Sequence, residues 1–237
     1  MNAFDDAVAS TTASALDPKI RVHLARLAGE GDRIEDRHRA TALELGRWIA
    51  ENHSPGRALG VIIVCTGNSR RSILGSTMGN LAAAFHGIPE VRFHSGGTAP
   101  SAFNPRTIAA LRAIGVEIEA TGTEAPRGDE GTPNPIHRVR WGGQGGPLEM
   151  LEFSKRFDDP ANPRTGFAAV MVCNEADAGC PFVPGAGLRL SMPYADPKEH
   201  DDTAEEAERY AERRDDIGRA MLVALAEARA RIDRSAD

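Results

Sequence analysis

The segment from Val61 to Ser72, with the sequence VIIVCTGNSRRS, limits the fold and chemistry of this chain more than any other. Its apolar, β-branched start is typical of a strand covered on both faces of a parallel sheet, and glycine and asparagine follow where the backbone must turn. A helix is predicted from Ser72 to about Phe85. Cys65 therefore lies where a buried strand ends and a loop leads into a helix.

A loop of this kind can bind an oxyanion and activate a thiolate. Successive backbone N–H groups near a helix N-terminus supply positive potential, and Arg71 adds a guanidinium that can clamp two oxygens of a tetrahedral anion. Burial of Cys65 at the end of a core strand is the structural alternative, but the strand–loop–helix context favours the functional interpretation. The predicted oxyanion-binding residues are Thr66, Gly67, Asn68, Ser69, Arg70 and Arg71.

The other two cysteines also follow a strand-like sequence. Cys173 comes directly after a predicted strand over 168–172, and Cys180 lies seven residues further on. Ligands of an open parallel sheet gather beyond the carboxyl ends of its strands, so we expect Cys65 and Cys173 at the same edge. The structural alternatives are a buried strand end for Cys173 and an unused loop thiol for Cys180. A phosphatase needs one thiol, whereas reduction of an oxyanion needs a relay of thiols.

Several motifs together resemble the low-molecular-weight protein tyrosine phosphatases and, more closely, the thioredoxin-coupled arsenate reductases built on the same fold. The resemblance covers 58–124 and 167–230. It is carried by the loop at 65–72, FHSGGT at 93–98, NPR at 104–106, VCNEADAGCP at 172–181 and the Asp-Pro pair at 196–197.

The resemblance implies a role for each motif. Cys65 would attack the oxyanion, Ser72 would stabilise its thiolate, and Asp196 would protonate the departing oxygen. Prolines at 193 and 197 restrict the backbone around Asp196, although an ordinary Asp-Pro turn is the structural alternative. Asp201 and Asp202 are the alternative acids. Cys173 and Cys180 would carry the disulfide to thioredoxin, so no organic cofactor is expected.

Two positions depart from the family pattern. Arg70 stands where both families often have cysteine, and we expect it to make the anion site more positive. Reductases of this type can bind a monovalent cation, at a site that the resemblance places near Asn68, Ser76, Ser95 and Glu124. Ser76 replaces a glutamate of the family, so at most a weak cation site is expected and no other metal.

Three functions follow from these observations. The first is reduction of arsenate to arsenite by Cys65, Cys173 and Cys180, with thioredoxin as the reductant. The second is a phosphomonoesterase that forms a phosphocysteine on Cys65, as in a low-molecular-weight protein tyrosine phosphatase. The third is an oxyanion-binding regulatory module without catalysis.

The expected fold is an α/β domain with a four-stranded parallel sheet and helices on both faces, covering residues 58–237. Strands are predicted at 61–64, 91–94, 168–172 and 188–191, and a second helix at 104–114. Residues 1–57 form a predicted N-terminal helical extension with helices at 18–29 and 33–52. The last helix, about 204–232, is laced with opposite charges, so we expect most of it to face solvent.

Residues 125–166 are a predicted insertion, because glycine, proline and charge dominate their composition. Alternation at 136–141 predicts a hairpin strand, and 148–157 a short helix. Arg138, Arg140 and Trp141 are candidates for a lid over the site. A charged hairpin with one packed tryptophan is the commoner outcome for such a segment, and we favour it over the lid.

Composition narrows the partners. The chain has 237 residues and a formal net charge of −6 without a basic block, so nucleic acid is not expected. No apolar run reaches the ~18 residues of a membrane span, and the N-terminus lacks the order of a signal peptide. Three cysteines do not make a disulfide framework. We therefore expect a cytoplasmic protein whose substrate is a small oxyanion.

Overall fold

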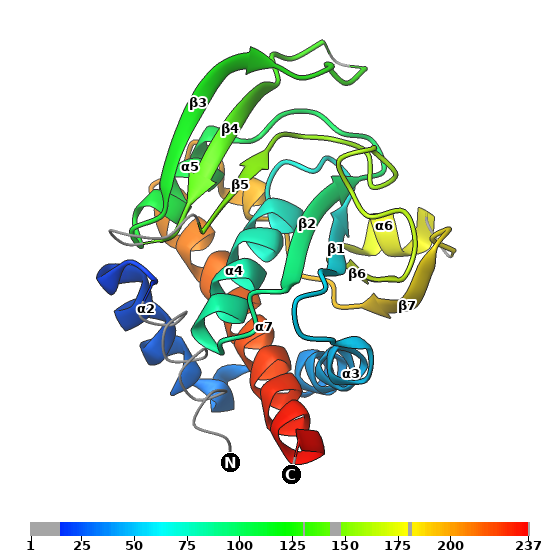
Figure 1. Ribbon diagram of the computed structural model, residues 1–237. Coiled ribbons are helices and arrows are strands. Elements are labelled where there is room, and N and C mark those ends of the chain that lie inside the picture. The colour runs from blue at the N-terminus through cyan, green and yellow to red at the C-terminus, as the bar shows by residue number, and fades with distance from the viewer. Residues whose placement is uncertain (1–14, 130, 143–147, 180–181, 237) are drawn as a thin grey trace.

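The computed structural model describes residues 15–129, 131–142, 148–179 and 182–236, and two sheets organise this part of the chain (Figure 1). The larger sheet has four parallel strands in the order β2-β1-β6-β7 and is flanked by helices. This arrangement confirms the predicted α/β fold. The strands are β1 (Leu59–Cys65), β2 (Val91–Gly97), β6 (Phe167–Met171) and β7 (Ala186–Ser191).

The central strands β1 and β6 bring two cysteines to one edge of this sheet. Both strands are almost wholly buried, which explains their continuous apolar sequences. Val64 is in register with Met171, so the strands end at the same level. Cys65 and Cys173 therefore lie at the same carboxyl edge, as predicted.

Helix α4 (Arg71–Phe85) follows β1 and packs against β1 and β2. It is buried on nearly all sides because α7 (Glu206–Ala236) lies across its outer face (Figure 1). Gly79 allows the Phe93 ring to contact the helix backbone, since a Cβ there would lie 2.3 Å from that ring. The shorter helices are α5 (Pro105–Arg112), α6 (Asn174–Gly179), η1 (Gly31–Arg33) and η2 (Pro197–His200).

The expectation that α7 mostly faces solvent is wrong. Ile217, Met221 and Leu225 recur every fourth residue and form a fully buried stripe. The helix contacts α2, α3, α4 and α5. Two of its charged side chains, Arg214 and Arg219, are buried as well. None of the helices in the described ranges has an apolar stretch long enough to cross a membrane.

The N-terminal helices are confirmed as α2 (Pro18–Ala28) and α3 (Asp36–Asn52). Asp17 begins α2 by accepting hydrogen bonds from the backbone N–H groups of residues 19 and 20. Buried side chains of both helices share the hydrophobic core of the sheet domain. The division at residue 57 stays a prediction, and residues 1–14 lie outside the described part.

The smaller sheet is antiparallel, in the order β3-β4-β5. It comprises β3 (Glu117–Glu124), β4 (Pro135–Arg140) and β5 (Glu149–Glu152), so the expected hairpin strand is confirmed. The predicted helix over 148–157 is wrong, because β5 pairs with β4 through backbone hydrogen bonds and places Glu152 opposite His137. The chain after β5 packs against the loop at 65–71, where Ser154 and Lys155 form hydrogen bonds with Gly67 and Asn68.

Arg138, Arg140 and Trp141 do not form a lid over the loop at 65–71. Arg140 pairs with Glu149 at 3.1 Å and Glu119 at 3.3 Å across the sheet, and Arg138 lies 3.8 Å from Glu149. Trp141 is buried in the core. The favoured interpretation, a charged hairpin with one packed tryptophan, is confirmed.

Candidate active site

The carbonyl oxygens at the end of β1 and in the loop between β1 and α4 accept hydrogen bonds from backbone N–H groups of the segment after β2. The backbone N–H groups of these loop residues find no acceptor among the described residues. Such a row of free donors at a helix N-terminus is an anion-binding nest. The bonds that fix it run from the N–H groups of Thr98, Ala99, Ser101 and Asn104 to the carbonyls of Cys65, Thr66, Gly67 and Ser69, at 2.9 to 3.2 Å.

Asn68 and Gly97 fix the shape of this loop. Asn68 adopts a φ of 40°, a left-handed conformation that asparagine tolerates better than most residues. Gly97, at the end of β2, lies directly against the loop, since a Cβ there would come within 2.5 Å of the Thr66 carbonyl oxygen. Only glycine allows this close approach.

Cys65 lies at the base of the nest and is bonded to Ser72. The two atoms Cys65 Sγ and Ser72 Oγ are 3.0 Å apart, and both side chains are buried. Asn68 Nδ2 donates to the same Ser72 hydroxyl at 2.9 Å. Because Ser72 Oγ accepts from Asn68, its own hydrogen is free to point to the sulfur. This geometry lets Ser72 donate a hydrogen bond to the Cys65 sulfur.

Arg71 and Asp196 meet at the edge of the loop. Arg71 Nη2 donates to Asp196 Oδ2 at 2.6 Å and Nη1 to the Tyr194 carbonyl at 2.9 Å. Its buried Nε has no partner in the described part of the chain. Asp196 Oδ1 accepts from the Lys198 N–H at 3.0 Å, which fixes the carboxylate at the start of η2. The predicted clamp and acid are thus side by side.

The side chain of Arg70 does not join the anion site. Its Nε donates to Tyr210 Oη at 2.6 Å and its Nη2 to Asp201 at 2.9 Å. The expectation that its charge makes the site more positive is wrong, because Asp201 neutralises it. Only the backbone N–H of Arg70 stays a candidate ligand.

The two alternative acids, Asp201 and Asp202, form ion pairs with arginines other than Arg71. Burial would raise the pKa of Asp201, but its bonds to Tyr210 and Arg70 outweigh this and hold the pKa below its usual range. Asp202 is 89% exposed and pairs with Arg106 at 2.6 Å. Asp196 is therefore the carboxyl group that faces Arg71.

Cys173 contacts the loop from β6. Its Sγ lies 3.5 Å from Thr66 Oγ1 and accepts from the Ala176 N–H at 3.4 Å. Burial raises the pKa of the Cys173 thiol, and the neighbouring Cys65 raises it further, against smaller opposite effects that include Thr66 and Arg71. Cys173 is thus a buried thiol in contact with the loop that follows Cys65. Cys180 lies outside the described residues.

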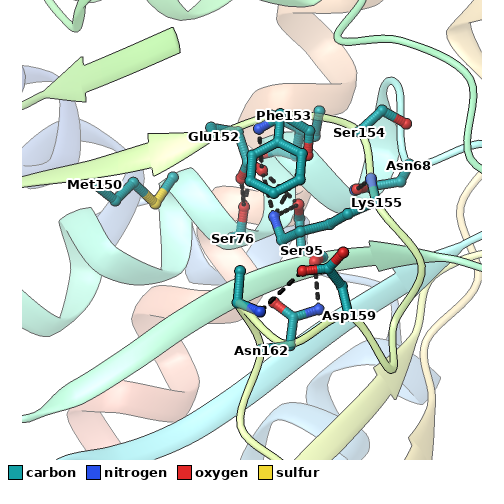
Figure 2. A network of polar contacts seen from close by, with 12 residues as sticks. Asn68, Ser76, Ser95, Met150, Glu152, Phe153, Ser154, Lys155, Asp159 and Asn162 are labelled. Carbon is teal, nitrogen blue, oxygen red and sulfur yellow. Dashed lines mark hydrogen bonds and ion pairs between the residues drawn. The ribbon is translucent and has the colours of Figure 1, made fainter. Parts of the chain in front are cut away.

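Two side chains of the insertion, Glu152 and Lys155, lie next to Ser76 and Ser95, where the sequence predicted a cation. Lys155 Nζ lies 2.9 Å from Glu152 Oε1 and 3.4 Å from Ser95 Oγ, and Ser76 Oγ lies 3.2 Å from Glu152 Oε2 (Figure 2). Glu152 thus brings a carboxylate to Ser76 and Ser95. Lys155 contacts two of the residues predicted to surround a cation, Ser95 through its ammonium and Asn68 through its backbone N–H.

Glu124 does not belong to this cluster, so its predicted role as a cation ligand is wrong. It is exposed and paired with Arg127 at 2.5 Å. Within the described ranges, no group of three or more His, Cys, Asp and Glu side chains is arranged to hold a metal ion.

Glu152, Ser154 and Lys155 are the site-proximal residues that the sequence did not predict. Because Glu152 and Lys155 are charged, the sequence alone suggests that they face solvent, but both are buried. The only signal was alternation along 149–152, which places residue 152 on the inner face of a strand.

No protein-family model and no curated protein sequence matches this chain. The arrangement itself combines a nest of backbone donors, a buried thiol with a hydroxyl partner, a guanidinium beside a carboxylate and a second thiol. Such a set can bind a tetrahedral oxyanion, attack it and protonate its leaving oxygen.

Proposed function

We propose that this chain reduces arsenate to arsenite through a thiol relay that thioredoxin regenerates. The observation that carries the proposal is the second thiol, Cys173, held against the Cys65 loop through Thr66 at the shared edge of β1 and β6. Hydrolysis through a phosphocysteine requires only Cys65, whereas reduction requires a second thiol. The resemblance to thioredoxin-coupled arsenate reductases supports the same choice.

In the first step, the oxyanion displaces Asp196 from part of the Arg71 guanidinium and binds the loop N–H groups. The Cys65 thiolate attacks arsenic, an S–As bond forms, and one hydroxyl leaves as water with a proton from Asp196. Ser72 stabilises the thiolate before the attack. Arsenic is still As(V) at this stage.

In the second step, the Cys173 sulfur attacks the Cys65 sulfur after losing its proton. A Cys65–Cys173 disulfide forms, and the electron pair of the S–As bond stays with arsenic, which leaves as arsenite, As(III). Cys180 then attacks Cys173, forming a Cys173–Cys180 disulfide and freeing the Cys65 thiolate. The dithiol of thioredoxin reduces this disulfide. Two electrons and two protons pass from thioredoxin to arsenate overall, yielding arsenite and water.

This relay requires α6 to rearrange, because its residues separate Cys173 from Cys180. A thioredoxin partner and reduced thiols belong with the cytoplasm, which we propose as its location.

A phosphomonoesterase is the second candidate. It is favoured by the Arg71–Asp196 pair beside Cys65, which supplies a clamp and an acid without a second thiol. In that reaction Cys65 would form a phosphocysteine that water hydrolyses.

A pair of assays separates the candidates. With thioredoxin, thioredoxin reductase and NADPH, the parent should oxidise NADPH only when arsenate is added, and Cys173→Ser and Cys180→Ser should each stop turnover. With p-nitrophenyl phosphate, the same variants should match the parent. Ester hydrolysis without arsenate-dependent NADPH oxidation would replace the reductase by the esterase. Inactivity in both, with sulfate binding retained, would leave the regulatory module.

A further inference from the structure

The insertion places a buried ion pair directly behind the nucleophile loop. The side chains of Lys155 and Glu152 are only 5% and 1% exposed. Burying two charges is costly unless further hydrogen bonds satisfy them. Here Glu152 Oε1 also accepts from Ser95 Oγ at 2.8 Å and from the Phe153 N–H at 3.0 Å (Figure 2). The pair is thus satisfied by β2 and by its own segment.

This ion pair fixes the segment 152–155 against the loop. The Lys155 carbonyl accepts from the Gly97 N–H at 2.9 Å, Ser154 Oγ donates to the Gly67 carbonyl at 3.0 Å, and the Lys155 N–H donates to Asn68 Oδ1 at 2.8 Å. The segment therefore touches the loop at residues 67 and 68, two and three positions after Cys65.

A chain of hydrogen bonds leads from this segment through Asn68 and Ser72 to Cys65, and the donor and acceptor of each bond are determined by chemistry. A backbone N–H only donates, so the Lys155 N–H requires the Asn68 oxygen to face it. The Asn68 amide then turns its Nδ2, which also only donates, to Ser72 Oγ. Ser72 accepts this bond, which leaves its hydroxyl hydrogen for Cys65 Sγ.

We propose that Lys155 and Glu152 are positioning residues for Cys65. Their ion pair holds the Lys155 N–H on Asn68, and through Asn68 and Ser72 it keeps a hydrogen-bond donor on the nucleophile. The proposal rests on the proposed function only in that Cys65 is the reacting thiol. In this proposal the insertion affects the reactivity of the Cys65 thiol through hydrogen bonds and does not cover the site.

The test is the rate at which iodoacetamide alkylates Cys65 at fixed neutral pH, followed by mass spectrometry of the peptide that contains Cys65. Lys155→Met removes the ammonium, and Asn68→Ala breaks the next link. Each should slow alkylation about tenfold, and the double variant should be slowed no further, because coupled residues are not additive. Arg140→Met removes an exposed ion pair of the same insertion and should alkylate as the parent does.

Glu152→Gln keeps the size of the side chain and removes its charge, so it carries the test if Lys155→Met does not fold. It should slow alkylation about threefold or more, consistent with a weakened ion pair. Urea unfolding establishes that each variant is folded under the assay conditions. A purely structural role would lower the urea midpoint without changing alkylation of the folded protein.

Parent-like alkylation in folded Lys155→Met or Glu152→Gln would overturn the proposal. So would an additive loss of about a hundredfold in the double variant, since independent residues add in free energy. Failure of the proposed function looks different. In that case the parent itself would alkylate no faster than free cysteine and would bind no sulfate by calorimetry.

Discussion

Arg71 Nη2 and Asp196 Oδ2 are 2.6 Å apart at the edge of the Cys65 loop. The guanidinium that should clamp the oxyanion is therefore held, before the anion binds, by the carboxyl group that should later donate a proton. Anion binding must exchange one negative partner of Arg71 for another, and this exchange frees Asp196 beside the leaving oxygen.

Asp196→Asn tests this relationship. We expect turnover to fall about 10²- to 10⁴-fold, because an amide cannot act as a general acid. Oxyanion affinity should stay the same or rise, because Arg71 loses a charged competitor. Steady-state kinetics and sulfate calorimetry measure the two effects. Asp202→Asn, at an exposed position, is the control and should change neither. Unchanged turnover in Asp196→Asn would assign the acid to another group or to water.

Ser72→Ala removes the hydroxyl bonded to Cys65. Alkylation of Cys65 should slow about tenfold, the effect of losing one hydrogen bond to a charged group. The free energy of unfolding should drop by about 1 to 3 kcal/mol, because Asn68 Nδ2 is left buried without its acceptor.

Thr77→Val is the matched control for that variant. Thr77 is buried on the same helix, and its hydroxyl has no partner among the described residues. Valine has nearly the same shape, so alkylation of Cys65 should not change. Equal rates in Ser72→Ala and the parent would remove Ser72 from the activation of the thiol.

The raised pKa of Cys173 predicts the pH dependence of the second step. At neutral pH the neutral thiol predominates, and below the pKa each unit of added pH increases the attacking thiolate about tenfold. Arsenite release in a single turnover should therefore accelerate from about pH 7 to about pH 9, provided the disulfide-forming step limits the rate. Hydrolysis of p-nitrophenyl phosphate by Cys173→Ser is the comparison. A flat pH profile for arsenite release would contradict the account.

Two buried histidines predict how stability depends on pH. Burial lowers the pKa of His86 and of His94 to about 4, in each case from an ordinary value of 6.5. Between these values the unfolded chain binds protons that the folded chain does not, so stability falls as pH drops from 6.5 to 4. The loss should be about 1 to 2 kcal/mol per histidine, after allowance for partial exposure.

Urea unfolding at pH 7 and at pH 5 measures this loss. The double variant His86→Gln with His94→Gln should show a smaller difference between the two pH values than the parent. His200→Gln, at a side chain that is 37% exposed, should behave as the parent does. An equal pH dependence in the double variant and the parent would mean that other groups are responsible.

The central part of the fold could be predicted from the sequence because its signals are local. The apolar run of β1, the turn after Cys65 and the start of α4 are adjacent in the chain. The meeting of Cys65 with Cys173 followed from the rule that ligands gather at the carboxyl ends of parallel strands. These features need no knowledge of distant contacts.

Other features depend on contacts between distant segments. Lys155 and Glu152 look like surface charges in the sequence, and only the path of the chain behind β2 buries them. The direction of the Arg70 side chain is set by Asp201 and Tyr210, more than a hundred residues away. The charges of α7 obscured its buried stripe, because the sequence does not show which partner covers a helix face.

The most direct test of the relay is a single turnover without thioredoxin. Fully reduced parent protein is mixed with excess arsenate, and arsenite and free thiols are counted. The account predicts one arsenite per chain, a fall from three free thiols to one, and a disulfide that peptide mapping assigns to Cys173 and Cys180. Cys173→Ser should yield no arsenite under the same conditions. A parent that keeps all three thiols and forms no arsenite would contradict it.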